Sequence, residues 1–154
     1  MSSQKPNSDR SHTIAVLVDN EPGVLARVIG LFAGRGYNIE SLTVSEVDAV
    51  KGYSRITIVT SGTDMVIEQI KALLDRLVPV HMVEDLTVQG PCLERELALV
   101  KVVNAGENRI EALRIADMFR ARAIDSTLNS FVFELTGSPK KLNAFIELMS
   151  GLGE

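Results

Sequence analysis

Aromatic side chains are scarce in this chain of 154 residues, and tryptophan is absent. Phe, Trp and Tyr together make up 5% of the sequence, whereas hydrophobic residues as a class make up 45%. The core must therefore be built mainly from aliphatic side chains. Because a small aliphatic domain often needs help to bury enough surface, this composition favours an oligomer.

Cysteine and histidine are equally sparse. Cys92 is the one cysteine, so the chain forms no internal disulfide, which suits a reducing cytoplasm. It fits a small linker residue better than a catalytic nucleophile, because no histidine lies near it in sequence. His12 and His81 are far apart and have no metal partner at a recognised spacing. Motifs of the Cys-x-x-Cys, His-Glu-x-x-His and Gly-x-Ser-x-Gly types are also missing, which argues against an enzyme.

An excess of basic residues is lacking as well. The formal net charge of −4 gives no electrostatic footprint for a nucleic-acid backbone. No apolar run approaches the roughly 20 residues needed to cross a bilayer. Residues 1–11 are polar and have no apolar segment of the kind found in secretory signals, so we expect a disordered tail.

Residues 12–89 alternate between strand and helix patterns. Residues 13–18 are β-branched and apolar on both faces, which predicts a central strand. The spacing of apolar residues then predicts a helix ending near Gly34 and Gly36, a hairpin from 37–47 and 53–59, a second helix capped by Thr63, and a strand over 80–88. The following side chains should face the core: Leu25, Val28, Ile29 and Phe32 in the first helix, and Val66, Ile70, Leu73 and Leu77 in the second helix. In the hairpin, Ser54, Ile56 and Ile58 alternate with Arg55, Thr57 and Val59, which predicts one face that is better buried than the other.

Residues 90–154 repeat this order after the break at Gly90-Pro91. Strands are predicted over 96–103, 124–128 and 131–135, and Ser138-Pro139 is typical of a helix start. The two helices should bury the following residues: Ile110, Leu113, Ala116 and Phe119 in the first, and Leu142, Phe145, Leu148 and Leu152 in the second.

The predicted fold is therefore α+β, with two tandem ferredoxin-like βαββαβ units. The second unit lacks its last strand, because the chain stops at Glu154 just after the fourth helix. Either the chain is trimmed there, or a partner covers the open sheet edge.

Two functions associated with such folds or loops are disfavoured. RNA-recognition modules share the βαββαβ order, but they stack bases on aromatics of the first and third strands. Only Tyr53 is near such a position. The run Gly34-Arg35-Gly36 follows a helix instead of joining a strand to a helix, so a C-cap is favoured over a phosphate loop.

The loop at residues 19–25 joins a central strand to a helix N-terminus. The first amides of a helix lack internal partners and favour an anion, such as the carboxylate of a free amino acid. Asn20 offers a donor and an acceptor, and Gly23 allows close approach to the backbone. Val24, Leu25 and Ile39 could form an aliphatic wall. The simpler alternative, that Asn20 caps the helix, Gly23 makes a turn and Val24 is core, is favoured by spacing alone.

The run Asn20-Glu21-Pro22-Gly23-Val24-Leu25 resembles the first loop of ACT domains, which are small amino-acid-sensing modules. Continued through Gly36-Tyr37-Asn38-Ile39-Glu40-Ser41-Leu42, it resembles the regulatory subunit of acetohydroxyacid synthase (acetolactate synthase). Residues 93–102 are similar to the start of that family's second domain. The resemblance covers residues 13 to about 152.

This resemblance implies a non-catalytic subunit with an ACT domain at 12–89, an ACT-like domain at 90–154 and no cofactor of its own. Its partner would be a large catalytic subunit carrying thiamine diphosphate, Mg²⁺ and FAD, which makes precursors of valine, leucine and isoleucine. The small subunit would raise the partner's activity and confer feedback inhibition by valine. ACT domains would pair side by side as a homodimer, with effector at the interface. The implied effector contacts are Asn20, Gly23, Val24 and Leu25 of one protomer and Asn38 and Ile39 of the other.

Two points stay open from the sequence. Pro22 and Val24 differ from smaller or more polar residues in many relatives, so the effector could be valine, leucine or isoleucine. The alternative function is a stand-alone ACT module that controls another enzyme or transcription. In the second unit, the loop at 104–109 lacks the Pro-Gly-Val-Leu pattern, so we expect no equivalent effector site there.

Overall fold

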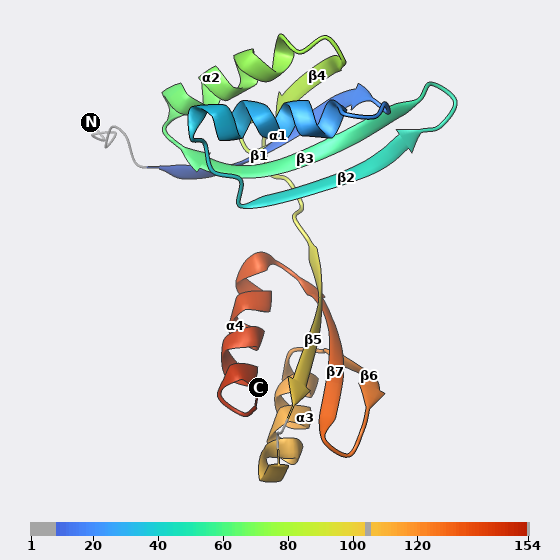
Figure 1. Ribbon diagram of the computed structural model, residues 1–154. Coiled ribbons are helices and arrows are strands. Elements are labelled where there is room, and N and C mark those ends of the chain that lie inside the picture. Colours follow the sequence, from blue (N-terminus) through green and yellow to red (C-terminus); the bar gives the residue numbers. More distant parts are fainter. Residues whose placement is uncertain (1–8, 104–105, 154) are drawn as a thin grey trace, which may run out of the picture. The chain divides into compact units, whose positions relative to one another are not determined.

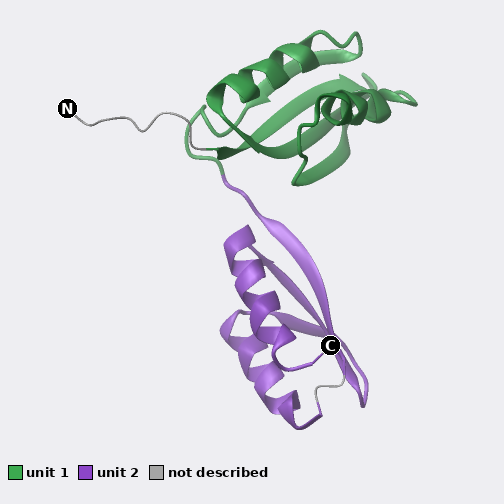
Figure 2. Cartoon of the chain, turned by 60° about the vertical axis from the view of Figure 1, so that its left-hand side comes forward, with its two compact units in different colours: residues 1–92 green, residues 93–154 purple. Residues whose placement is uncertain are grey.

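The computed structural model describes residues 9–103 and 106–153, which form two compact units, 1–92 and 93–154 (Figures 1 and 2). Most of the expected disordered tail, residues 1–8, lies outside the described residues. Its last part was predicted wrongly, because Arg10 and Ser11 already belong to the first strand. Arg10 pairs with Gly62, so the strand continues as far as its neighbour offers hydrogen-bonding partners.

The first unit is a four-stranded antiparallel sheet with two helices on one face (Figure 1). Its strand order is β2-β3-β1-β4, which confirms the predicted ferredoxin-like unit. The elements in chain order are β1 (Arg10–Asp19), α1 (Val24–Arg35), β2 (Ser41–Asp48), β3 (Tyr53–Gly62), α2 (Asp64–Asp75) and β4 (Val80–Asp85).

The core of this unit lies between the sheet and its helices. Alternate residues of β1 and β3 point inward. The prediction that one face of the hairpin is better buried is confirmed, and the buried face carries Ser54, Ile56 and Ile58, which are at most 4% exposed. Helix α1 adds Val28 and Phe32 as predicted, but Leu25 and Ile29 are 37% and 40% exposed. The described core is thus aliphatic apart from Phe32.

Helix α2 begins as predicted and turns a slightly different face inward. The Thr63 hydroxyl accepts a hydrogen bond from the Val66 amide, which confirms the N-cap. The fully buried residues are Ile67, Ile70 and Leu74, whereas the expected set was Val66, Ile70, Leu73 and Leu77. Apolar residues occur in adjacent pairs here, and spacing alone does not decide which member of each pair faces the core.

The second unit is a three-stranded antiparallel sheet of order β5-β7-β6 with two helices. Within the described residues no fourth strand follows, so β5 forms an open edge. The elements are β5 (Glu96–Val103), the 3₁₀ turn η1 (Gly106–Asn108), α3 (Arg109–Met118), β6 (Arg122–Ser126), β7 (Ser130–Gly137) and α4 (Pro139–Ser150).

The face of α3 was predicted correctly only in part. Ala116 is buried and Phe119 packs against the core as predicted, whereas Ile110 is 67% and Leu113 44% exposed, and Ala112 and Ile115 are buried in their place. Small alanine side chains allow α3 to lie close to its neighbours. Because apolar residues occur on two sides of α3, their spacing alone does not decide which side faces the core. Helix α4 follows the prediction more closely, with Ser138 as N-cap and Leu142, Phe145 and Met149 buried, although Leu148 is 46% exposed.

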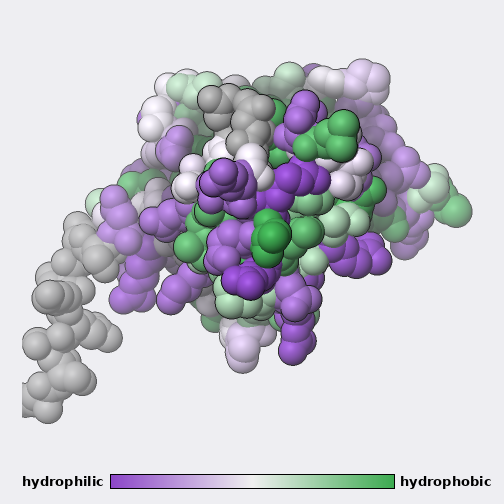
Figure 3. Space-filling view, turned by 90° about the horizontal axis from the view of Figure 1, so that it is seen from below, coloured by the Kyte–Doolittle hydropathy of each residue, from purple (hydrophilic) through white to green (hydrophobic). Residues whose placement is uncertain are grey.

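Exposed hydrophobic side chains are distributed over both units. On the face drawn in Figure 3, hydrophobic and hydrophilic residues are interleaved, as is usual for a protein surface. None of the described helices is long and apolar enough to span a membrane.

Candidate functional site

Helix α1 begins at a glycine that holds a left-handed conformation. Gly23 precedes the helix with φ of +86°, which other residues rarely adopt, and it has no side chain with which to cap the helix. A Cβ atom built at Gly23 would meet no described atom within 4 Å, so the described residues leave the space beside this turn open. Among the described residues, no hydrogen bond reaches the amides of Leu25 and Ala26. This end of α1 therefore offers free donors to an anion.

Asn20 lies three residues before this glycine and does not cap the helix. Its backbone N–H donates to the Gly52 carbonyl at 2.7 Å, which fastens the loop to the start of β3. Its side-chain Nδ2 donates to Glu46 Oε2 on β2 at 3.0 Å. The simple capping interpretation of Asn20 is thus wrong, and the side chain keeps Oδ1 as its other polar atom.

The three aliphatic residues expected around the ligand differ in accessibility. The Val24 side chain is 4% exposed and belongs to the core, so the simpler interpretation is confirmed for that residue. Leu25 is 37% exposed, and Ile39 is half-buried against the core. Leu25 and Ile39 are the members of this set whose side chains have accessible surface.

Asn38 and Ile39 lie beyond the other end of α1. The helix closes at Gly36, whose φ is +69°, and the Tyr37 amide bonds back to the Phe32 carbonyl, as in a Schellman motif. The Asn38 side chain is exposed, and the backbone carbonyl of Asn38 accepts a hydrogen bond from Thr60 Oγ1 at 2.6 Å.

The two halves of the expected site are therefore well separated within one chain. Asn20 is fixed to Gly52 and Asn38 to Thr60, at opposite ends of β3. Eight residues of extended strand span about 26 Å. A small amino acid bridges a few ångströms, so one chain cannot bring both halves to the same ligand.

A histidine and aspartate pair that the sequence did not reveal lies beside this loop. His81 Nε2 on β4 is 2.6 Å from Asp19 Oδ1, and the Tyr53 ring lies 4.7 Å from the His81 ring. The Asp19 amide also donates to the Pro79 carbonyl. These contacts hold β1, β3 and β4 together where the loop begins. Residues 62 positions apart carry no spacing signal, so only the fold brings them together.

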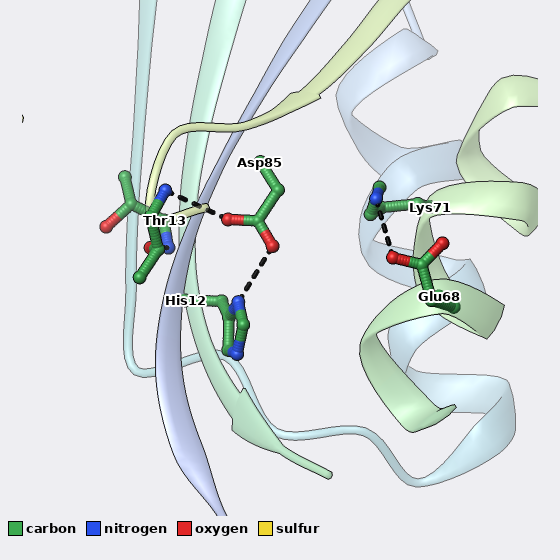
Figure 4. Close-up of polar contacts among 6 residues, drawn as sticks. His12, Thr13, Glu68, Lys71 and Asp85 are labelled. Atoms are coloured by element: carbon green, nitrogen blue, oxygen red, sulfur yellow. Dashed lines mark hydrogen bonds and ion pairs between the residues drawn. The ribbon is translucent and has the colours of Figure 1, made fainter. Parts of the chain in front are cut away.

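A second pair, His12 and Asp85, is buried at the other end of β1 (Figure 4). Nδ1 lies 2.7 Å from Oδ2, and the side chains are 5% and 2% exposed. Asp85 also accepts from the Thr87 amide, whereas His12 Nε2 has no hydrogen-bond partner in the part of the chain that the structure describes. Because the carboxylate accepts, Nδ1 is the donor. No group of three or more His, Cys, Asp or Glu side chains suited to a metal occurs in the described ranges, and we interpret this pair as structural.

The corresponding loop of the second unit includes Asn104 and Ala105, which lie outside the described residues. In its described part, the Arg109 guanidinium donates to the carbonyls of Thr127 and Leu128 and lies 4.1 Å from the centre of the Phe131 ring. Arg109 therefore ties the start of α3 to the hairpin between β6 and β7.

Comparisons with known proteins identify both units. Residues 14–82 match the family model of the AHAS small subunit-like ACT domain, and residues 95–153 match that of the small subunit of acetolactate synthase.

Whole-chain relatives agree with these matches. The probable acetolactate synthase small subunit of Archaeoglobus fulgidus is 47% identical over 92% of this chain and 87% of its own length. The acetolactate synthase small subunit of Aquifex aeolicus is 48% identical over 94% of this chain and 74% of its own. The crystal structure of the small subunit from Thermotoga maritima superposes with a TM-score of 0.83 at 38% identity, covering 94% of this chain and 90% of that one. The chain therefore belongs to the family of acetolactate synthase small subunits, the regulatory subunits of that enzyme.

Proposed function

We propose that this chain activates a separate catalytic subunit of acetolactate synthase and makes it sensitive to feedback inhibition by valine. The observation that carries the proposal is the open start of α1, where the amides of Leu25 and Ala26 have no partner among the described residues and Asn20 belongs to the same loop. A free amino acid has the matching groups, since its carboxylate suits the helix amides and its ammonium suits an amide oxygen.

The second half of the site would come from another copy of the chain. Strand β2 lies at the edge of its sheet. It begins at Ser41, two residues after Ile39, and ends at Asp48, which pairs with Tyr53 beside the Gly52 carbonyl that Asn20 contacts. If two copies pair antiparallel along β2, the start of one β2 lies opposite the end of the other. That arrangement places Asn38 and Ile39 of one protomer near residues 20–25 of its partner. The separation of the halves within one chain supports this shared site.

Valine at such an interface would favour one packing of the dimer over another. An effector shifts an equilibrium only by its difference in affinity for the two states, typically about 1–3 kcal/mol in allosteric proteins. In this proposal the valine-bound packing holds the catalytic subunit in a less active state. Thiamine diphosphate, Mg²⁺ and FAD would be bound by the catalytic subunit, and the reaction would take place there.

The proposal is tested by reconstitution with the purified catalytic subunit. Pyruvate turnover should rise when this chain is added and fall again as valine is titrated in. A chain that neither binds the catalytic subunit in a pull-down nor changes its turnover would exclude the proposal. That result, together with tight valine binding, would favour the alternative of a stand-alone sensing module.

A further inference from the structure

We infer that Glu46 is part of the effector site, where it orients Asn20 and provides the negative charge that pairs with the ligand's ammonium group. The inference rests on the proposed function, because it concerns the same site. It predicts a selectivity: the site should prefer an α-amino acid to the 2-hydroxy acid of the same carbon skeleton.

The position of Glu46 follows from the register of β2. Glu46 pairs with Ser54, and the alternate residues Leu42 and Val44 pair with Ile58 and Ile56. Ser54, Ile56 and Ile58 are buried beneath the helices, so Glu46 points to the same face of the sheet as α1. It lies toward the end of β2 that neighbours the Asn20 loop, and its side chain is exposed.

The contact with Glu46 fixes which way the Asn20 amide points. A carboxylate only accepts hydrogen bonds, so the atom 3.0 Å from Glu46 Oε2 must be the amide nitrogen. Asn20 Oδ1 then points away from Glu46. Together the two side chains present oxygen acceptors and one negative charge, which is the environment an ammonium group requires.

The two ends of an amino acid thus find complementary surroundings. The amides of Leu25 and Ala26 and the dipole of α1 attract its carboxylate, and Glu46 with Asn20 Oδ1 attracts its ammonium. Of the other acids in this region, Asp19 is engaged by His81 at 2.6 Å and Asp48 accepts from the amides of Val50 and Lys51, whereas Glu21 lies in the loop itself. Glu46 is the carboxylate that contacts the Asn20 side chain, so we assign to it the distinction between an ammonium and a hydroxyl group.

The test is to measure the binding of valine and of 2-hydroxy-3-methylbutanoate to the full-length chain by titration calorimetry. The hydroxy acid is expected to bind more weakly, so its Kd is measured by letting valine displace it. Glu46→Gln retains an acceptor for Asn20 but removes the charge. We expect the valine Kd to rise about tenfold and the hydroxy-acid Kd to change little, since a charged hydrogen bond is lost only for valine. Glu147→Gln, an exposed position on α4 with the same change in charge, is the control and should leave both values unchanged.

The outcomes separate this inference from the function on which it rests. If Glu46→Gln weakens both ligands equally, Glu46 only holds the loop and its charge plays no part. If valine binding is unchanged in the variant, Glu46 lies outside the site, but the proposal that valine is the effector still holds. If the unmodified chain binds no valine, the effector site and the role of Glu46 are both wrong.

Discussion

At the scale of single residues, the His12 and Asp85 pair makes the clearest contribution to stability. His12→Val leaves a carboxylate that is 2% exposed without its histidine partner. We expect a loss of about 2–4 kcal/mol in the free energy of unfolding, because the buried carboxylate keeps the hydrogen bond from the Thr87 amide but loses the one from His12. Urea unfolding followed by circular dichroism measures this change.

A matched double variant tests the physical reason. Replacing both partners, His12→Val with Asp85→Val, removes the buried charge as well as its partner. It should lose less stability than the single His12→Val change, since no charge remains buried. A double variant clearly less stable than the single one would contradict this explanation.

Gly23 provides the most specific residue-scale test of the effector loop. Gly23→Asp places a carboxylate where the ligand's own carboxylate is expected, so valine inhibition should be lost while activation of the catalytic subunit is retained. Gly23→Asn is the control. The asparagine side chain has nearly the same size as that of aspartate and tolerates the φ of +86° equally well, but it carries no charge. Acetolactate formation across valine concentrations distinguishes them. Normal valine sensitivity in the Asp variant would show that the ligand does not lie at this turn.

At the scale of elements, strand β2 is expected to form the dimer interface. Ser45 lies near its middle and is exposed, so the Ser45→Lys change brings two positive charges together where the strands cross the two-fold axis. We expect dissociation toward monomers in analytical ultracentrifugation, with weaker valine binding as a consequence. Ser150→Lys, at an exposed position at the end of α4, is the control and should leave the chain dimeric in the same measurement. A Ser45→Lys chain that stays dimeric would place the interface elsewhere.

The elements also show what sequence patterns could and could not predict. The order of strands and helices followed from apolar spacing and from caps such as Thr63 and Ser138, because these signals are local. The inward faces of α2 and α3 were predicted correctly only in part, since apolar residues lie next to one another in sequence and spacing does not decide which of them faces the core. The contacts of His81 with Asp19 and of Glu46 with Asn20 join residues distant in sequence, so they needed the fold.

The effector loop illustrates the same limit. Spacing alone favoured Asn20 as a helix cap, yet the cap position is occupied by Gly23 and the Asn20 side chain reaches across to β2. The simple interpretation was right for Val24, whose side chain is core. The resemblance to a family, and not the local physics, indicated that this loop binds a ligand.

At the scale of the whole molecule, the proposed effector site is one that no single chain completes. Asn20 and Asn38 are anchored at opposite ends of β3, so the ligand must join two protomers if both residues contact it. Such a site responds to how the protomers pack, and that packing is what a catalytic partner could sense. The affinity of an effector site within one chain would not depend directly on how the protomers pack.

Mixing two inactive variants tests this claim most directly. Chains with Asn20→Ala and chains with Asn38→Ala should each bind valine poorly as homodimers, because every site lacks one contact. After the two are unfolded together and refolded in equal amounts, half of the dimers are mixed, and each mixed dimer contains one intact and one doubly altered site. Calorimetry should then detect about a quarter as many valine sites as in the unmodified dimer, with the affinity of the unmodified site. If the mixture binds no better than the separate variants, the effector site is not shared between two chains.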